Sequence, residues 1–144
     1  MLIGFDVGGT NARGMLIDPD TLAIVAQARA SSAGDGPTLI ATLGSLVDEL
    51  EDGHAPATTI GLGVAGLAHR SGTVHYSPNL PNLVEFPLGT EFGKAVGLPI
   101  TVMNDATAGA WAEAKTGGGQ GADDFAYVAL GTGIGTGFVV NLSL

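Results

Sequence analysis

The stretch that decides the fold is MLIGFDVGGTNARGMLI, residues 1–17, in which Gly8-Gly9-Thr10 separates two apolar runs. The runs at 2–7 and 13–18 predict the strands of a hairpin, because glycine and threonine between apolar segments mark a tight turn. Such a turn exposes backbone N–H groups that no side chain covers, and the threonine hydroxyl adds another donor. This is the chemistry of a phosphate-binding loop.

The same arrangement recurs near the other end of the sequence. FAYVAL (125–130) breaks on Gly131-Thr132-Gly133 and, after a second Gly-Thr-Gly, continues as FVV (138–140). We expect a second hairpin over 125–142. Two such turns in one chain predict two loops that close on one polyphosphate from opposite sides.

The sequence between the two turns alternates strand and helix patterns. Pro37 suits the first turn of a helix, and apolar residues recur at helical spacing up to Leu50. The predicted strands are 22–28, 59–64, 73–77 and 98–103, and the predicted helices are 37–50, 88–96 and a third from Asn104 to about Lys115. This order predicts a mixed central sheet with flanking helices, which is an α/β fold.

Composition narrows the class of protein. The 144 residues are 45% hydrophobic and 13% charged, which favours a folded domain, and the net charge is −9 with only 5 lysines and arginines. So acidic a chain is a poor partner for nucleic acid or an anionic membrane. The absence of cysteine excludes disulfides and thiolate metal sites, zinc included. Without a signal peptide or a membrane-spanning segment, we expect a cytoplasmic protein.

Asp6 stands inside an apolar strand, immediately before the first glycine turn. A carboxylate there is costly unless a partner satisfies it. One interpretation is that Asp6 faces phosphate oxygens through Mg²⁺ or its bound waters. The other is that Asp6 closes the turn through its own backbone. The neighbouring Gly8-Gly9-Thr10 favours the first interpretation.

Asn104 and Asp105 follow a predicted strand and open a predicted helix. Asparagine is a favoured helix cap, and an acidic residue in the first turn suits the helix dipole. Alternatively, Asp105 is a general base that takes a proton from an attacking hydroxyl. Both interpretations hold together, because α/β sheets place their sites where strands end and helices begin.

Other polar residues carry weaker signals. Asn79 and Asn82 lie in a proline-rich loop, where Asn82 is typical of a turn. His69 and His75 have no partner at metal-ligand spacing, and Trp111 is more typical of packing than of a substrate platform. No G-x-x-x-x-G-K-[ST] motif is present, so the sequence does not predict a P-loop.

Four segments in collinear order resemble the ROK family of sugar kinases and repressors, within the actin/hexokinase-like ATPase superfamily. They are IGFDVGGTNARG, GVAGLAHRSGTVHYSPNLPN, VMNDATAGAWAEA and ALGTGIGTGFVV. The resemblance implies a ribonuclease H-like (actin-like ATPase) lobe over 1–117. It also implies that 118–144 is a hinge and the first hairpin of an incomplete second lobe. A phosphate motif that starts at Met1, with no helix-turn-helix before it, favours the kinase branch.

The resemblance also implies a role for each matching residue. The first turn would contact Mg²⁺-bound phosphates of ATP from one side through Asp6, Gly8, Gly9 and Thr10, with Asp6 reaching the metal through water. The second turn would contact them from the other side through Gly131, Thr132 and Gly133. Sugar hydroxyls would be bound by Gly66, Asn79 and Asn104, and Asp105 would deprotonate the attacking hydroxyl, which is the one on C6 in glucokinases.

Two functions follow from this resemblance. The first is an ATP-dependent hexose kinase that converts glucose to glucose 6-phosphate. The second is a non-catalytic remnant that binds sugar or a partner without phosphoryl transfer, because most of the family's second lobe is missing. The sequence leaves open the sugar (glucose, another hexose or an N-acetylated amino sugar) and the donor (ATP or polyphosphate). It also leaves open whether hairpin 125–142 pairs with a second copy, pairs with the first lobe or is disordered.

Overall fold

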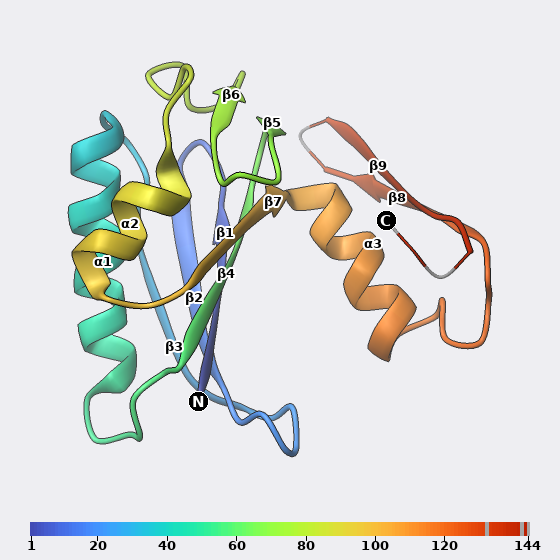
Figure 1. The fold of residues 1–144 in the computed structure, drawn as a ribbon, viewed down its shortest axis with the longest axis horizontal. Helices are drawn as coiled ribbons and strands as arrows, with labels where there is room; N and C mark the ends of the chain where they lie inside the picture. The colour runs from blue at the N-terminus through green and yellow to red at the C-terminus, as the bar shows by residue number, and fades with distance from the viewer. Residues whose placement is uncertain (132, 142, 144) are drawn as a thin grey trace.

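The protein is a mixed five-stranded sheet with helices, and a separate hairpin lies beside it (Figure 1). The computed structural model describes residues 1–131, 133–141 and 143. The strands are β1 (Leu2–Val7), β2 (Asn11–Ile17), β3 (Ile24–Ser31), β4 (Thr59–Val64), β5 (Leu67–Ala68), β6 (Val74–Tyr76), β7 (Ile100–Asn104), β8 (Phe125–Leu130) and β9 (Ile134–Val139). The helices are α1 (Gly36–Glu51), α2 (Leu88–Val96) and α3 (Asp105–Thr116).

The large sheet has the strand order β3-β2-β1-β4-β7 and is mixed, as the sequence predicts. β1 pairs with β2 in antiparallel orientation, whereas β1, β4 and β7 are parallel to one another. The carboxyl ends of parallel strands share one edge of a sheet, where α/β proteins place their sites. The β1–β2 turn, the loop after β4 and the start of α3 therefore lie at the same edge (Figure 1).

Two strand boundaries differ from the prediction for local reasons. β2 begins at Asn11 rather than at residue 13, because the Gly8 N–H donates to the Asn11 carbonyl at 3.0 Å and closes the turn tightly. β3 begins at Ile24 rather than at residue 22, because Leu22 has a left-handed backbone with φ of 58°. β3 then extends to Ser31, which pairs with Asn11.

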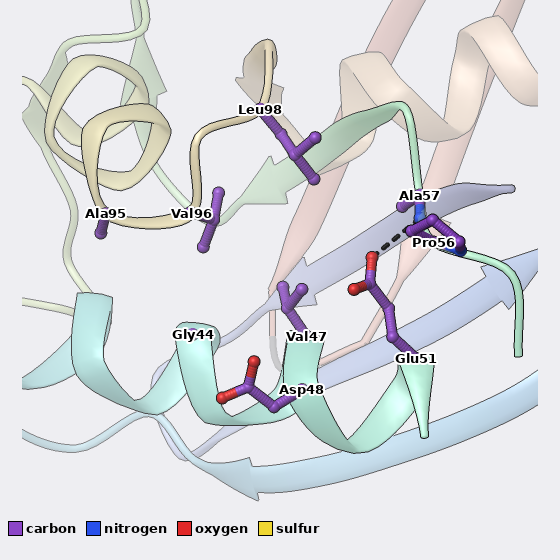
Figure 2. A pocket seen from close by; sticks show the side chains of 9 residues that line it. All are labelled: Gly44, Val47, Asp48, Glu51, Pro56, Ala57, Ala95, Val96 and Leu98. Carbon is purple, nitrogen blue, oxygen red and sulfur yellow. Dashed lines mark hydrogen bonds between the residues drawn. The ribbon is translucent and has the colours of Figure 1, made fainter. Parts of the chain in front are cut away.

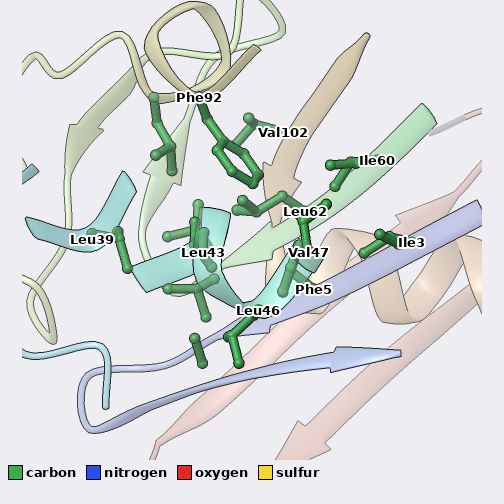
Figure 3. Packing of buried hydrophobic residues seen from close by; sticks show 14 of the residues in the cluster. Ile3, Phe5, Leu39, Leu43, Leu46, Val47, Ile60, Leu62, Phe92 and Val102 are labelled. Atoms are coloured by element: carbon green, nitrogen blue, oxygen red, sulfur yellow. The ribbon is translucent and has the colours of Figure 1, made fainter. Parts of the chain in front are cut away.

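The core lies between the sheet and helices α1 and α2 (Figure 3). Alternate residues of β1 and β4 point to these helices, and Phe5 packs edge to face on Phe92 with ring centroids 6.0 Å apart. Helix α1 contributes its buried face at the predicted spacing, through Leu39, Leu43, Leu46, Val47 and Leu50. Each large buried side chain contributes about 1.5–3 kcal/mol, so this layer dominates the stability of the fold.

The start of α1 is fixed by a helix cap and a close contact. Asp35 accepts a hydrogen bond from the Thr38 N–H at 2.9 Å. Hydrogen bonds from the Thr38 hydroxyl and N–H hold the pKa of Asp35 below its ordinary value of 3.8. A Cβ on Gly36 would collide with the ring of Phe86, so only glycine lets this ring lie against the helix start.

Helix α3 and the β8–β9 hairpin pack against each other, away from α1 and α2 (Figure 1). A Cβ on Gly137 would lie 2.5 Å from the Ala110 Cβ and 2.8 Å from the Ala106 carbonyl oxygen. A Cβ on Gly135 would lie 2.9 Å from the Ala106 Cβ. These glycines let β9 lie directly on the small residues of α3.

The hairpin forms a two-stranded sheet of its own, and neither of its strands joins the five-stranded sheet. Its outward face is apolar, with Val128, Leu130, Ile134 and Phe138 between 55% and 81% exposed. Self-association through this face stays a prediction, as does the division of the chain at residues 117 and 118. No helix in the described part of the chain is both long and apolar enough to cross a membrane.

Candidate functional site

The first glycine turn presents two backbone donors that no described residue occupies. The Gly8 N–H is used inside the turn, where it donates to Asn11. The N–H groups of Gly9 and Thr10 have no hydrogen-bond partner among the described residues, and Thr10 is exposed. The turn therefore offers two amides and one hydroxyl to a ligand.

Asp6 and Asp105 are brought to neighbouring positions at the carboxyl edge of the sheet. Asp6 is exposed, and its register partners are Arg13 on β2 and Gly63 on β4. A Cβ on Gly63 would lie 3.6 Å from the Asp105 Cα, so the backbone of Asp105 passes over the strand next to Asp6. The described residues give the Asp6 carboxylate no hydrogen bond or ion pair.

Asn104 performs the capping role that the sequence predicts, and it also fixes a loop. Its side-chain oxygen accepts the Thr107 N–H at 3.1 Å at the start of α3. Its Nδ2 donates to the Gly66 carbonyl at 2.9 Å, which ties the loop after β4 to the start of the helix. Two of the predicted sugar-binding residues, Asn104 and Gly66, are thus in direct contact.

Asp105 is the first residue of α3 and is exposed. One carboxylate oxygen, Oδ1, accepts the N–H of Ala106 at 2.8 Å. This bond fixes the orientation of the carboxylate, and Oδ2 has no partner in the described part of the chain. The geometry leaves one oxygen of Asp105 available for a proton.

The loop that carries Asn79 lies directly on the first glycine turn. A Cβ on Gly9 would lie 2.6 Å from the Asn79 carbonyl oxygen and 2.9 Å from the Asn79 Cβ. Only glycine permits this approach, and the Asn79 side chain stays exposed. The predicted phosphate turn and the predicted sugar loop are therefore neighbours in space, although about 70 residues separate them in sequence.

The second glycine turn lies at the tip of the β8–β9 hairpin. Gly131 and Gly133 are exposed, and the Gly131 N–H donates to the Gly133 carbonyl at 2.9 Å. Thr132 lies outside the described residues. Within those residues, no hydrogen bond joins the second turn to the first.

Three other polar residues, Asn82, His69 and His75, have side-chain partners in the structure. Asn82 lies in a turn, as predicted, and its Nδ2 also donates to the Gly34 carbonyl at 3.1 Å, a contact that the sequence does not predict. The His69 Nδ1 lies 2.9 Å from the Ser71 hydroxyl. The His75 Nδ1 lies 2.8 Å from Glu85. The described residues hold no cluster of three metal-ligating side chains.

Sequence reasoning missed two residues that touch this site, Ser32 and Ser77. The Ser32 hydroxyl donates to the Gly8 carbonyl at 2.6 Å. The Ser77 hydroxyl donates to the Ala65 carbonyl at 2.5 Å and accepts the Leu80 N–H at 3.0 Å. Serine is common in loops, so the sequence carries no signal that separates these two from the exposed serines.

Cavities lie on both faces of the sheet, and two of them are lined by Asp6. Figure 2 shows a cavity of about 410 Å³ between α1 and the end of α2, where Glu51 accepts the Ala57 N–H at 2.8 Å. It lies at the amino ends of β4 and β7, far from the glycine turns, and α/β sheets bind ligands at the other end. A second cavity, of about 370 Å³, separates the sheet from α3 and is lined by Asp6, Gly63 and Trp111.

Known proteins resemble this chain over its whole length. The sequence model of the ROK family matches residues 2–144. Glucokinase of Streptomyces coelicolor is 33% identical over 145 residues, which is 100% of this chain and 45% of that protein. An N-acetyl-D-glucosamine kinase of Yersinia pseudotuberculosis is 26% identical over 144 residues, covering 100% of this chain and 47% of that protein.

A solved structure has the same fold. The crystal structure of a ROK family glucokinase from Streptomyces griseus in complex with glucose and AMPPNP has a TM-score of 0.89 and 31% identity, covering 99% of this chain and 45% of that one. The predicted actin-like ATPase fold, a mixed sheet with flanking helices, is thus confirmed. The chain spans less than half the length of these relatives. Because the family match includes nearly every residue, the protein belongs to the ROK family.

Proposed function

We propose that this chain carries the sugar-binding and catalytic half of an ATP-dependent hexose kinase, with glucose as the substrate and glucose 6-phosphate as the product. The observation that supports it is the convergence of Asp105, the Asn104–Gly66 bond and the Gly9–Asn79 contact at one edge of the sheet. Phosphoryl transfer depends mainly on positioning and charge stabilisation, and a site built from turns and one base suits it.

Asp105 is the proposed general base. Its Oδ1 is held by the Ala106 N–H, and its Oδ2 is free to take the proton of a sugar hydroxyl as the oxygen attacks phosphorus. A positioned base of this kind typically contributes about 10²–10⁴-fold to the rate. Gly66, Asn79 and Asn104 would hold the sugar so that this hydroxyl faces Asp105.

The first turn is the proposed phosphate contact, and Asp6 the proposed contact to Mg²⁺. Mg²⁺ commonly binds through one or two carboxylates, water and substrate phosphates. The residues fit this requirement, since Asp6 is one exposed carboxylate without a partner in the described part of the chain, beside the free amides of Gly9 and Thr10. When bound, the ion would neutralise charge on the phosphates. Gly131, Thr132 and Gly133 remain the proposed second contact to the nucleotide.

The similar proteins support a choice of sugar and phosphate donor for this proposal. One is a glucokinase, one is an N-acetyl-D-glucosamine kinase, and one was solved with glucose and AMPPNP. We take glucose and ATP as the proposed pair, because the relatives at 31–33% identity are glucokinases and one of them holds an ATP analogue. The cytoplasmic location stays a prediction.

We further propose that the 144 residues alone do not turn over at an ordinary rate. A closed cleft excludes water and aligns the two substrates, which requires walls on both sides of the nucleotide. In this structure the second turn stands on a hairpin with an uncovered apolar face. A chain that binds sugar without phosphoryl transfer is therefore the second candidate function, and it applies to the chain by itself.

A chimaera tests the kinase proposal. Residues 1–144 would replace the matching segment of the Streptomyces coelicolor glucokinase, and glucose 6-phosphate formation would be measured in a coupled dehydrogenase assay. We expect activity in the chimaera that falls about 10²–10⁴-fold on Asp105→Asn. The matched control is Asp52→Asn, an exposed acid at the far end of α1, which should keep full activity.

Two results would contradict these proposals. A chimaera in which Asp105→Asn retains full activity would remove Asp105 as the base. A 144-residue chain that alone shows ordinary turnover, lost on Asp105→Asn, would overturn the proposal that the isolated chain lacks kinase activity.

A further inference from the structure

Two serines stand out because their side chains are buried. Ser32 is 1% exposed and Ser77 is fully buried, and no other polar or charged side chain in the described part of the chain is buried. A hydroxyl without a hydrogen bond is costly in such a place. Each of these two hydroxyls is satisfied by a backbone carbonyl beside a glycine of the candidate site.

Ser32 follows β3 and holds the first glycine turn from outside. Its hydroxyl donates to the Gly8 carbonyl at 2.6 Å, and its own N–H donates to the Thr10 carbonyl at 3.1 Å. The Gly8 carbonyl and the Gly9 N–H belong to one planar trans peptide, in which they point in opposite directions. Fixing the carbonyl on one side therefore aims the free Gly9 N–H to the other side.

Ser77 does the same at the loop after β4. Its hydroxyl donates to the Ala65 carbonyl, which shares a peptide plane with the Gly66 N–H. The same hydroxyl accepts the Leu80 N–H at 3.0 Å, which closes the loop that carries Asn79. The Gly66 N–H has no partner among the described residues, so it too is a fixed donor left for a ligand.

We propose that Ser32 and Ser77 are positioning residues with separate ligands: Ser32 aims the Gly9 N–H at a phosphate, and Ser77 aims the Gly66 N–H at a sugar hydroxyl. The assignment of ligands rests on the proposed kinase function. The two serines act through different strand ends and different peptide planes. Loss of the Ser32 hydroxyl should therefore weaken phosphate binding alone, and loss of the Ser77 hydroxyl should weaken sugar binding alone. A merely structural role would weaken both ligands alike.

Four single variants of the 144-residue chain test this inference: Ser32→Ala, Ser77→Ala, Ser32→Cys and Ser45→Ala. Ser32→Cys keeps the volume of the side chain but is a weak donor. The control Ser45→Ala removes an exposed hydroxyl that donates to the Ala41 carbonyl within α1. Each ¹⁵N-labelled variant is titrated with Mg·AMPPNP and separately with glucose, and both dissociation constants are read from amide chemical shifts.

We expect Ser32→Ala and Ser32→Cys to weaken Mg·AMPPNP binding about tenfold and glucose binding less than twofold, because one buried hydrogen bond to a functional peptide is lost. Ser77→Ala should show the reverse, and Ser45→Ala should change neither. Variants that weaken both ligands equally, or neither, while the spectrum shows a folded chain, would overturn the inference.

A readout without ligand separates this inference from the kinase proposal. In the free chain, Ser32→Ala should move the Gly9 amide resonance and leave that of Gly66 in place, and Ser77→Ala should do the opposite. If the parent chain binds neither ligand, the ligand assignment falls with the proposed function. If each variant moves the Gly9 and Gly66 amide resonances together, or moves neither, the positioning role itself would be overturned.

Discussion

The five-stranded sheet and the β8–β9 hairpin are both apolar, but they are covered very differently. The sheet has two helices on one face, and its core cluster runs from Ile3 to Val102. The hairpin lies on the small residues of α3, and within the described residues its only fully buried apolar side chain is Val139. A strand pair becomes independently stable only when another layer covers its apolar face. The half of the proposed site at the edge of the five-stranded sheet is therefore supported by a packed layer of helices. The half on the β8–β9 hairpin is not.

The largest expected effect concerns the covered layer. Leu43 on α1 is fully buried, so Leu43→Ala should lower the free energy of unfolding by about 2–5 kcal/mol. Leu130→Ala on the outward face of the hairpin should change it by less than about 0.5 kcal/mol, since Leu130 is 81% exposed. Urea denaturation of both variants measures the difference. Equal losses of unfolding free energy in Leu43→Ala and Leu130→Ala would mean that the hairpin belongs to the same cooperative core.

The second prediction detaches the hairpin from α3. A valine at position 137 would place its Cβ 2.5 Å from the Ala110 Cβ, so Gly137→Val should cost about 1–3 kcal/mol in the stability of the hairpin. Hydrogen exchange should speed up over 125–139 and stay unchanged in β1 and β4. The matched control is Gly133→Ala, because a Cβ there has no neighbour within 4 Å. Faster exchange in the large sheet would contradict the separation of the two regions.

The third prediction concerns the uncovered face itself. Exposed apolar edges associate, so we expect the chain to self-associate through this face at high concentration. The double variant Leu130→Lys/Phe138→Lys should weaken that association at least tenfold, which corresponds to about 1.4 kcal/mol. Sedimentation velocity over a concentration series measures it. A charge introduced at an exposed position elsewhere, as in Ser45→Lys on α1, should leave association unchanged, and equal effects of the two changes would argue against a hairpin interface.

The smallest effect concerns the cap of the helix that covers the sheet. Because the pKa of Asp35 is lowered in the folded protein, its contribution to stability is present above the unfolded value of 3.8 and is lost as the pH falls below that value. In thermal melts, the parent should have a higher melting temperature than Asp35→Ala at pH 7. The difference between the two melting temperatures should be smaller below pH 3.8. Asp35→Asn, which caps without titrating, should keep its advantage over Asp35→Ala at both pH values. A difference in melting temperature between the parent and Asp35→Ala that widens in acid would contradict the lowered pKa of Asp35.

The same comparison explains which features the sequence predicts well. The sequence predicts a helix over 88–96, and α2 is observed over Leu88–Val96, where the left-handed backbone of Gly97 ends the helix locally. The mixed sheet follows from the order of the strand and helix patterns along the chain, and the first glycine turn follows from a local pattern. β5 was not predicted, because two residues, Leu67 and Ala68, are too short to show a strand period.

The features that the sequence could not supply depend on contacts between distant segments. The burial of Ser32 and Ser77 arises from how β3 and the loop after β6 close over other turns. The need for glycine at position 9 comes from the Asn79 backbone, and at position 137 from α3. In each case the residue type is ordinary for a turn or a strand, and only the neighbour gives it a role.

Hydrogen exchange resolved by residue on the unmodified 144-residue chain tests the central claim most directly, namely that one half of the site is formed by a complete layer and the other by an isolated hairpin. Stability within a protein ranges from almost zero to the global value, and exchange measures it amide by amide. We predict that β1 and β4 exchange only through global unfolding, and that amides of β8 and β9 exchange at least about 100-fold faster. Protection of the hairpin equal to that of β1 would contradict the claim.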